Sequence, residues 1–131
     1  MTARFNGAGL ASSRLLQSSG CDDIQDFLNL SATAEAFAVT ALGGALDNAA
    51  NGLLAISEEA IGALEAARAA EEAHYQFLLD EGAEPVTLTF TIPDEAILTD
   101  PATFWTTLVA LEEAFIAHYC AAAQHLSLIH I

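Results

Sequence analysis

The sequence contains no lysine, and its only cationic side chains are Arg4, Arg14 and Arg68. Against these three stand 18 acidic residues, so the formal net charge is −15. Nucleic-acid binding needs a basic surface that displaces phosphate counterions, and this composition excludes such a surface. The same lack of positive charge excludes electrostatic attraction to an anionic membrane.

Long apolar runs and a complete secretion signal are also missing. No uncharged, strongly hydrophobic run reaches the length of about 18 residues that a membrane-spanning helix needs. Arg4 and Arg14 resemble the basic start of a signal peptide, but no apolar stretch of suitable length follows them. We therefore expect no membrane span, and the localisation stays unknown.

The chain has only two cysteines, Cys21 and Cys120. Two cysteines make neither a disulfide framework nor a zinc-binding spacing, so they do not fix the compartment. On the helices predicted below, their heights differ by about 9 Å, more than the Cα separation of a disulfide allows. We expect two free thiols.

Apolar residues, by contrast, are plentiful. They make up 53% of the sequence, and the mean hydropathy is +0.40, which excludes intrinsic disorder. A chain of 131 residues has room for one domain with one core. Residues 1–21 are rich in Gly, Ser and Ala without a steady period, which is typical of a loose leader. The folded domain is predicted to span residues 22–125.

Three long helices are predicted from periodicity and capping residues. Apolar residues recur at steps of three and four over residues 22–48, and the same pattern follows Ser57, a preferred helix N-cap. Gly82 is a good stop for this second helix. Asp100 and Pro101 begin a third helix, as N-cap and first helical residue. The predicted fold class is all-α.

Residues 86–92, between the second and third helices, alternate between apolar and polar side chains. This period of two is typical of a half-buried strand, and Pro85 and Pro93 bracket it. A lone strand has no partner within the chain. The segment therefore either pairs with another copy or is an extended connector.

Three carboxylates occupy apolar stripes of the predicted helices: Glu35 on the first, Glu71 on the second and Glu112 on the third. An unpaired carboxylate in such a position costs several kcal/mol or takes up a proton, so something must compensate these three. The neighbouring Glu72 and Glu113 fall off the stripes, and we expect them to point outward.

The heights of the three acids along a bundle can be compared. Glu35 lies 13 residues before Asn48 and Glu71 lies 13 residues after Glu58, so in an antiparallel hairpin both are about 20 Å from the loop. Glu112 is about 17 Å from the start of the third helix. If the second and third helices begin at the same end, all three acids share a level to within one helical turn. Residues 81–100 are long enough to span the bundle and allow this arrangement.

His74 follows Glu71 by three residues and completes a Glu-x-x-His pair. A Glu on one helix facing Glu-x-x-His on another is half of a carboxylate-bridged di-iron or di-manganese site in a helical bundle. Carboxylate and imidazole ligands suit iron and manganese. The predicted metal ligands are Glu35, Glu71, His74 and Glu112, and no residue is predicted to be catalytic.

Two segments carry a resemblance to a known family: AAEEAHYQFLLDEGAEP at residues 69–85 and FWTTLVALEEAFIAHY at residues 104–119. With the alternating crossover between them, they resemble the ferritin-like domain family, in the branch that includes desiccation-related proteins. The resemblance covers residues 22–126. It implies a four-helix bundle with a long extended crossover between helices 2 and 3, and its motif positions fall on the same four residues.

The resemblance also implies a fourth helix with a second Glu-x-x-His, which the chain lacks. Residues 126–131, LSLIHI, resemble a translated sequencing adapter, and we expect an artefactual tail on a truncated reading frame. The groove for the absent helix is predicted to be lined by Leu28, Phe37, Phe115 and Tyr119. An open apolar groove of this kind favours a homo-oligomer.

Two functional hypotheses remain open. In the first, the intact parent protein binds a di-iron or di-manganese centre for stress protection, iron oxidation or iron storage. In the second, the protein is a structural or interaction bundle of the desiccation-related type, and its buried acids are protonated or hydrogen-bonded. The resemblance is compatible with an extracytoplasmic location. We do not expect efficient catalysis from the chain as it stands.

Overall fold

The computed structural model describes the backbone of residues 22–129 and the side chains of residues 24–124. This part of the chain is all-α, as predicted. Its helices are α2 (Asp22–Ala50), α3 (Glu58–Asp80), α4 (Ala96–Thr99) and α5 (Pro101–Ile129). The predicted leader lies outside the described residues, and so do residues 130–131 of the predicted tail. The backbone of α5 continues through residues 126–129.

The predicted helix ends are confirmed by their hydrogen bonds. Ser57 Oγ accepts from the backbone N–H of Ala60 at 3.2 Å, at the start of α3. Asp100 Oδ1 accepts from the backbone N and the Oγ1 of Thr103, at 2.9 and 2.7 Å. These bonds hold the pKa of Asp100 below its ordinary value. Gly82 follows α3 with φ +90°, a conformation that favours glycine.

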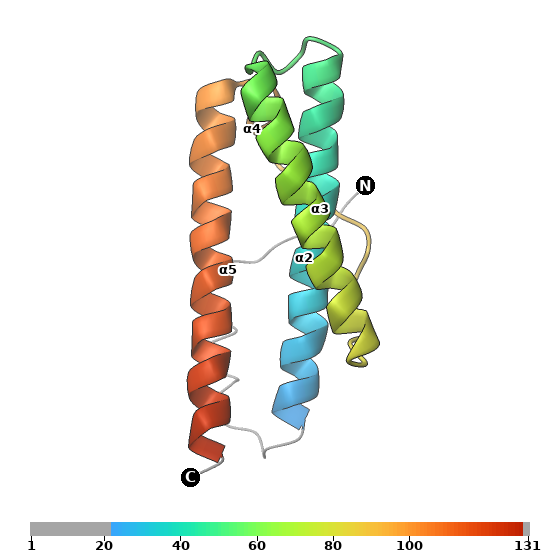
Figure 1. The fold of residues 1–131 in the computed structure, drawn as a ribbon, viewed down its shortest axis with the longest axis vertical. Coiled ribbons are helices and arrows are strands. Elements are labelled where there is room, and N and C mark those ends of the chain that lie inside the picture. The colour runs from blue at the N-terminus through green and yellow to red at the C-terminus, as the bar shows by residue number, and fades with distance from the viewer. Residues whose placement is uncertain (1–21, 130–131) are drawn as a thin grey trace.

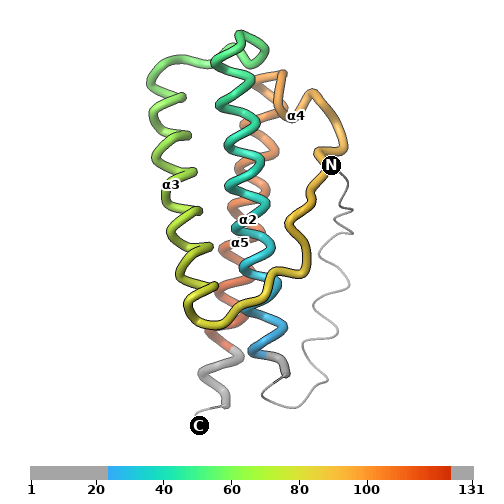
Figure 2. The backbone as a smooth tube through the Cα atoms, turned by 90° about the vertical axis from the view of Figure 1, so that its right-hand side faces the viewer, coloured from blue at the N-terminus to red at the C-terminus, as the bar shows by residue number. Residues whose placement is uncertain are grey.

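The helices lie side by side along one axis. α2 runs antiparallel to both α3 and α5, and the latter two begin at the same end of the molecule (Figure 1). Figure 2 shows the connector between α3 and α4 returning along the length of α2. The predicted long crossover and the parallel arrangement of the second and third long helices are therefore confirmed.

Residues 86–92 form an extended connector in the single chain, one of the two predicted alternatives, and pairing with another copy stays a prediction. Within residues 22–129 the structure has no β-strand. The alternation does not separate two faces either, because Val86 and Leu88 are exposed while Phe90 is buried. Side chains of α2 replace the missing strand partner: Asn29 Oδ1 accepts from Glu84 N at 2.7 Å, and Thr33 Oγ1 from Val86 N at 2.8 Å.

The short helix α4 is absent from the sequence prediction, because four residues are too few to show a helical period. Asp94 Oδ1 caps it by accepting from Ala96 N at 2.9 Å. Leu98 packs on the buried cluster near the α2–α3 loop, and Asn48 Nδ2 donates to its carbonyl at 2.9 Å. Gly44 faces Leu98, whose Cδ1 lies 3.3 Å from where a Cβ at this position would be.

Two apolar clusters stabilise the bundle at different heights. The larger one lies near the α2–α3 loop and consists of Leu42, Ala45, Leu54, Leu64 and Phe104. The smaller one, near the other end of the hairpin, consists of Ala32, Leu78 and Ala83. Along both α2 and α3, the polar group described below lies between these two clusters.

Of the four residues predicted to line an open groove, Leu28, Phe37 and Phe115 are half-buried and Tyr119 is 38% exposed. Leu28 packs against the smaller apolar cluster, and Phe37 and Phe115 line a pocket. Exposed apolar side chains occur elsewhere, with Phe77 on α3 and both Val109 and Ile116 on α5 more than half exposed.

Two further sequence predictions concern the cysteines and the membrane. Cys120 is a free, exposed thiol, while Cys21 lies outside the described residues. Among the helices of residues 22–129, none combines the length and the apolar character needed to cross a bilayer.

Candidate metal site

Glu35 is the most deeply buried carboxylate in the described part of the chain. It lies on α2, one turn after the fully buried Ser31, and only 1% of its surface is exposed. The inward-facing stripe predicted for this helix is therefore correct. The sequence folds so that this carboxylate enters the interior between the two apolar clusters.

Glu71 and His74 face Glu35 from α3. Glu71 is 9% exposed, and its Oε2 lies 3.3 Å from Nδ1 of His74, three residues further along the helix. The His74 side chain is 61% exposed. The pair therefore connects a buried carboxylate to solvent through the imidazole ring.

The three side chains converge on one point. His74 Nδ1 lies 3.7 Å from Glu35 Oε2, and one ligand atom from each of Glu35, Glu71 and His74 lies within 4.8 Å of the others. Three of the four predicted metal ligands are thus brought together. Glu72, the neighbour of Glu71, is exposed as predicted.

Tyr119 joins this group from α5. Its hydroxyl donates a hydrogen bond to Oε1 of Glu35. The sequence prediction assigned Tyr119 to an apolar groove, so its polar role was missed. Tyr119 follows Glu112 by seven residues, so both lie on the same face of the helix. This spacing could have suggested Tyr119 as a polar partner for a buried acid.

Burial and a second carboxylate dominate the electrostatics of Glu35. Burial raises its pKa, and the neighbouring carboxylate of Glu71 raises it further, to about 7 against an ordinary 4.5. The Tyr119 hydroxyl and His74 oppose this rise of the pKa. Burial, followed by the contact with Glu35, raises the pKa of Tyr119 above its ordinary value.

One oxygen of Glu35 has no hydrogen-bond donor. Oε1 accepts from Tyr119, whereas the buried Oε2 has no hydrogen-bond partner among the described groups. A buried carboxylate oxygen without a partner costs about 1–3 kcal/mol. It therefore needs either a proton shared with Glu71 or a cation.

A second polar contact joins α2 to α5 through His118, the residue before Tyr119. Ser31 Oγ and His118 Nε2 share a hydrogen bond of 3.0 Å, and the ring of Phe27 stacks on His118 at 4.5 Å between centroids. Burial lowers the pKa of His118, which favours its neutral form. These contacts tie α5 to α2 beside Glu35.

Glu112 lies outside the group of three. It is half-buried on α5, in the wall of an apolar pocket, while Glu113 is exposed as predicted. Helical side chains lean toward the N-terminus of their own helix. Because α2 and α5 are antiparallel, Glu35 and Tyr119 lean toward each other, whereas Glu112 leans away from Glu35. Its role as a fourth ligand stays a prediction from the sequence.

Comparison with known proteins adds no relative. No family profile, no curated protein and no solved structure matches this chain.

Proposed function

We propose that Glu35, Glu71 and His74 bind a transition-metal ion, iron or manganese, in a bundle of the ferritin-like type. The observation that carries this proposal is the buried Oε2 of Glu35, which lacks a donor and faces the ligand atoms of the other two residues. The antiparallel hairpin and the long crossover support the ferritin-like architecture. In that architecture, a fourth helix would supply the remaining ligands.

The donor set fits such an ion. At metal–ligand distances of about 2.1 Å, neighbouring ligand atoms are separated by about 3.0–3.4 Å. The distances from His74 Nδ1 to Glu71 and to Glu35 are 3.3 and 3.7 Å, so small side-chain movements suffice. Two carboxylates and one imidazole are typical ligands of iron and manganese.

The protein residues have distinct parts in this proposal. Glu35, Glu71 and His74 hold the ion, and Tyr119 orients Glu35 through its hydrogen bond. The exposed side of His74 leaves access from solvent. A bound iron or manganese ion would supply one-electron redox chemistry, which stress protection, iron oxidation and iron storage all use.

The test is Mn²⁺ binding, measured by the loss of the free-ion signal in electron paramagnetic resonance. Glu71→Gln should weaken binding about tenfold or more, because it removes a charged ligand. Glu72→Gln is the matched control: it removes the same charge from the adjacent, exposed position and should leave the affinity nearly unchanged. Equal losses in the two variants would show that Mn²⁺ binds only to the acidic surface.

A second candidate is a structural bundle without a working metal site. It is favoured by the pKa of Glu35, about 7, which lets Glu35 and Glu71 share a proton near neutral pH without any ion. In this case Glu71→Gln would bind Mn²⁺ no more weakly than Glu72→Gln does, and it would change only the stability of the protein.

A further inference from the structure

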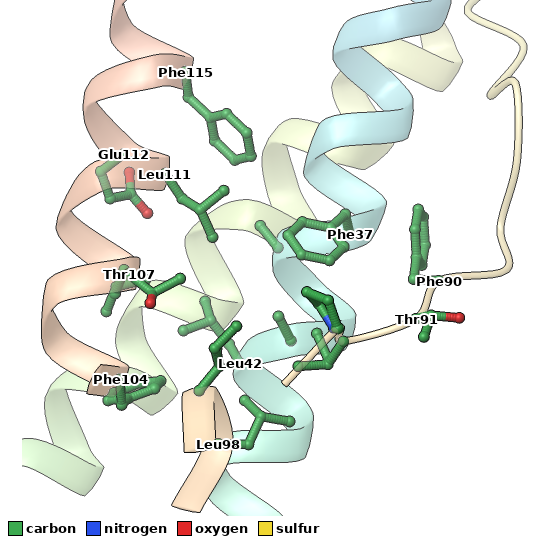
Figure 3. A pocket seen from close by; sticks show the side chains of 16 residues that line it. Phe37, Leu42, Phe90, Thr91, Leu98, Phe104, Thr107, Leu111, Glu112 and Phe115 are labelled. Atoms are coloured by element: carbon green, nitrogen blue, oxygen red, sulfur yellow. The ribbon is translucent and has the colours of Figure 1, made fainter. Parts of the chain in front are cut away.

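A pocket of about 500 Å³ lies between α2 and α5, and its lining includes none of Glu35, Glu71 and His74. The connector and α4 complete its wall, contributing Phe90 and Leu98. Figure 3 shows Phe37 of α2 and both Leu111 and Phe115 of α5 projecting into the space between these elements. A volume of this size, with mostly apolar walls, is typical of a small-molecule binding site.

The wall contains one ionisable group. Of the sixteen described residues that line the pocket, only Glu112 carries a charge, and it lies next to Leu111 on α5 (Figure 3). Thr91 and Thr107 are the remaining polar residues. Glu112 is half-buried in an otherwise apolar wall, and a carboxylate in this position forms its strongest pair with a ligand that brings a positive charge or a donor.

The charged groups around the pocket favour a positively charged ligand over a negatively charged one. The lining has no arginine, and the only arginine among the described residues, Arg68, lies on α3 beside Glu65 and Glu72. With a net charge of −15, the protein repels anions and attracts cations. Phe115, one turn after Glu112, adds an aromatic ring on the same wall, and such rings attract cations.

We propose that this pocket binds a hydrophobic amine, with its alkyl or aryl body among the phenylalanine and leucine side chains and its protonated amino group paired with Glu112. The α5 wall from Phe104 to Phe115 extends over about 16 Å, which suits an elongated ligand. Binding at this pocket does not require a metal at Glu35, Glu71 and His74. Glu112 is also the fourth ligand predicted from the sequence, so the amine is tested on metal-free protein, and a failure of Mn²⁺ binding at Glu35, Glu71 and His74 leaves this inference unaffected.

The experiment compares three ligands with the same ten-carbon chain: decylamine, decanol and decanoate. Each displaces the uncharged fluorescent probe N-phenyl-1-naphthylamine from the full chain at pH 7 and 0.15 M NaCl. Decylamine should displace the probe at the lowest concentration and decanoate at the highest. Glu112→Gln should weaken decylamine about tenfold and leave decanol unchanged, because only the charged pair is lost.

Glu113→Gln is the matched control, since it removes the same charge from the adjacent exposed residue. It should change the decylamine affinity less than twofold. Ala41→Phe, which fills the pocket from α2, should abolish probe binding while the helical circular dichroism is retained.

Either of two results would overturn the proposal. One is equal binding of decylamine and decanol to the original protein. The other is the same loss of decylamine affinity in Glu112→Gln and Glu113→Gln, which would indicate attraction to the general negative charge alone.

Discussion

The contact between Tyr119 and Glu35 gives a buried carboxylate its only hydrogen-bond donor among the described residues. Tyr119→Phe removes that donor and leaves both oxygens of Glu35 without one. We expect a loss of about 2 kcal/mol in the free energy of unfolding at pH 8. At pH 5 the loss should be smaller, since a protonated Glu35 needs the donor less. Urea denaturation at pH 5 and at pH 8 measures the two losses of unfolding free energy.

The matched control is Tyr75→Phe, the only other tyrosine variant that the chain offers. Tyr75 packs against the smaller apolar cluster on α3. The loss of its hydroxyl should cost little and should not depend on pH. A cost of Tyr119→Phe that is equal at pH 5 and pH 8 would contradict the role of the hydroxyl toward the ionised carboxylate.

Glu35 also gives the folded protein a characteristic pH dependence. Its pKa is about 7 in the folded state and 4.5 ordinarily, so between these values the folded state binds more protons than the unfolded chain. Stability therefore decreases as the pH rises through this window and levels off above pH 7. Relative to Glu35→Gln, the original protein should lose about 3 kcal/mol between pH 4.5 and 7.5.

Comparison with this variant is necessary, because the repulsion among the other acids also grows with pH. Denaturation midpoints of the original protein, Glu35→Gln and Glu113→Gln separate the two effects. Glu113→Gln should follow the original curve in shape. A Glu35→Gln curve parallel to the original one would show that Glu35 titrates normally in the folded state.

At the scale of single elements, α2 holds the connector through a row of polar side chains one turn apart. Gln25 Nε2 donates to Gly82 O at 3.0 Å, Asn29 accepts from Glu84 N, and Thr33 accepts from Val86 N. These bonds replace the partner strand that the connector lacks. They also fix its first residues against the helix that carries Glu35.

Asn29→Ala removes the central bond of this row. We expect a loss of about 1–2 kcal/mol in stability and faster hydrogen exchange at the amide of Glu84, because that N–H loses its acceptor. Asn51→Ala is the control, since Asn51 bonds only within its own turn, to Asp47 O. Unchanged exchange at Glu84 would mean that the connector is held by other contacts.

The elements differ in how far the sequence alone predicts them. The ends of α3 and the start of α5 can be predicted locally, because the residues that determine them contact only residues close by in the sequence. These residues are Ser57, Gly82, Asp100 and Pro101. The path of the connector depends on Asn29 and Thr33, more than fifty residues away from the atoms that they bind. No local pattern reveals such contacts, so the alternation at residues 86–92 left a paired strand and an extended connector as equal alternatives.

The candidate site likewise has a part that the sequence predicts and a part that it does not. Periodicity and helix lengths were sufficient to bring Glu35, Glu71 and His74 together, because all three lie on one antiparallel hairpin. The position of Glu112 relative to them depends on how α5 sits against α2, which residue counting from the helix ends does not resolve. The Tyr119–Glu35 bond escaped prediction for this reason.

At the scale of the whole molecule, exposed apolar side chains favour self-association, whereas the large negative charge disfavours it. Val109 and Ile116, two turns apart on one face of α5, are 56% and 62% exposed. We expect this face to drive weak self-association, which the charge of −15 resists. Association should strengthen between 0.05 and 0.5 M NaCl, because salt screens the repulsion.

Sedimentation velocity at the two salt concentrations measures this effect. The double variant Val109→Ser and Ile116→Ser should remain monomeric at both. Leu53→Ser, which removes an equally exposed apolar side chain from the α2–α3 loop, is the control and should associate like the original protein. A monomer at every salt concentration would contradict the expectation of a homo-oligomer.

The bonds between α2 and α5 also set the order in which the molecule assembles. Glu35 and Tyr119 are 84 residues apart in sequence, and Ser31 and His118 are 87 apart, whereas α2 and α3 are joined by a short loop. Closing a long loop costs more entropy, so the hairpin should form first and α5 should dock after the rate-limiting barrier. Stopped-flow kinetics should then show that Leu78→Ala slows folding, whereas Tyr119→Phe only speeds unfolding. Three of the candidate metal ligands would thus meet early, before the tyrosine that orients one of them arrives.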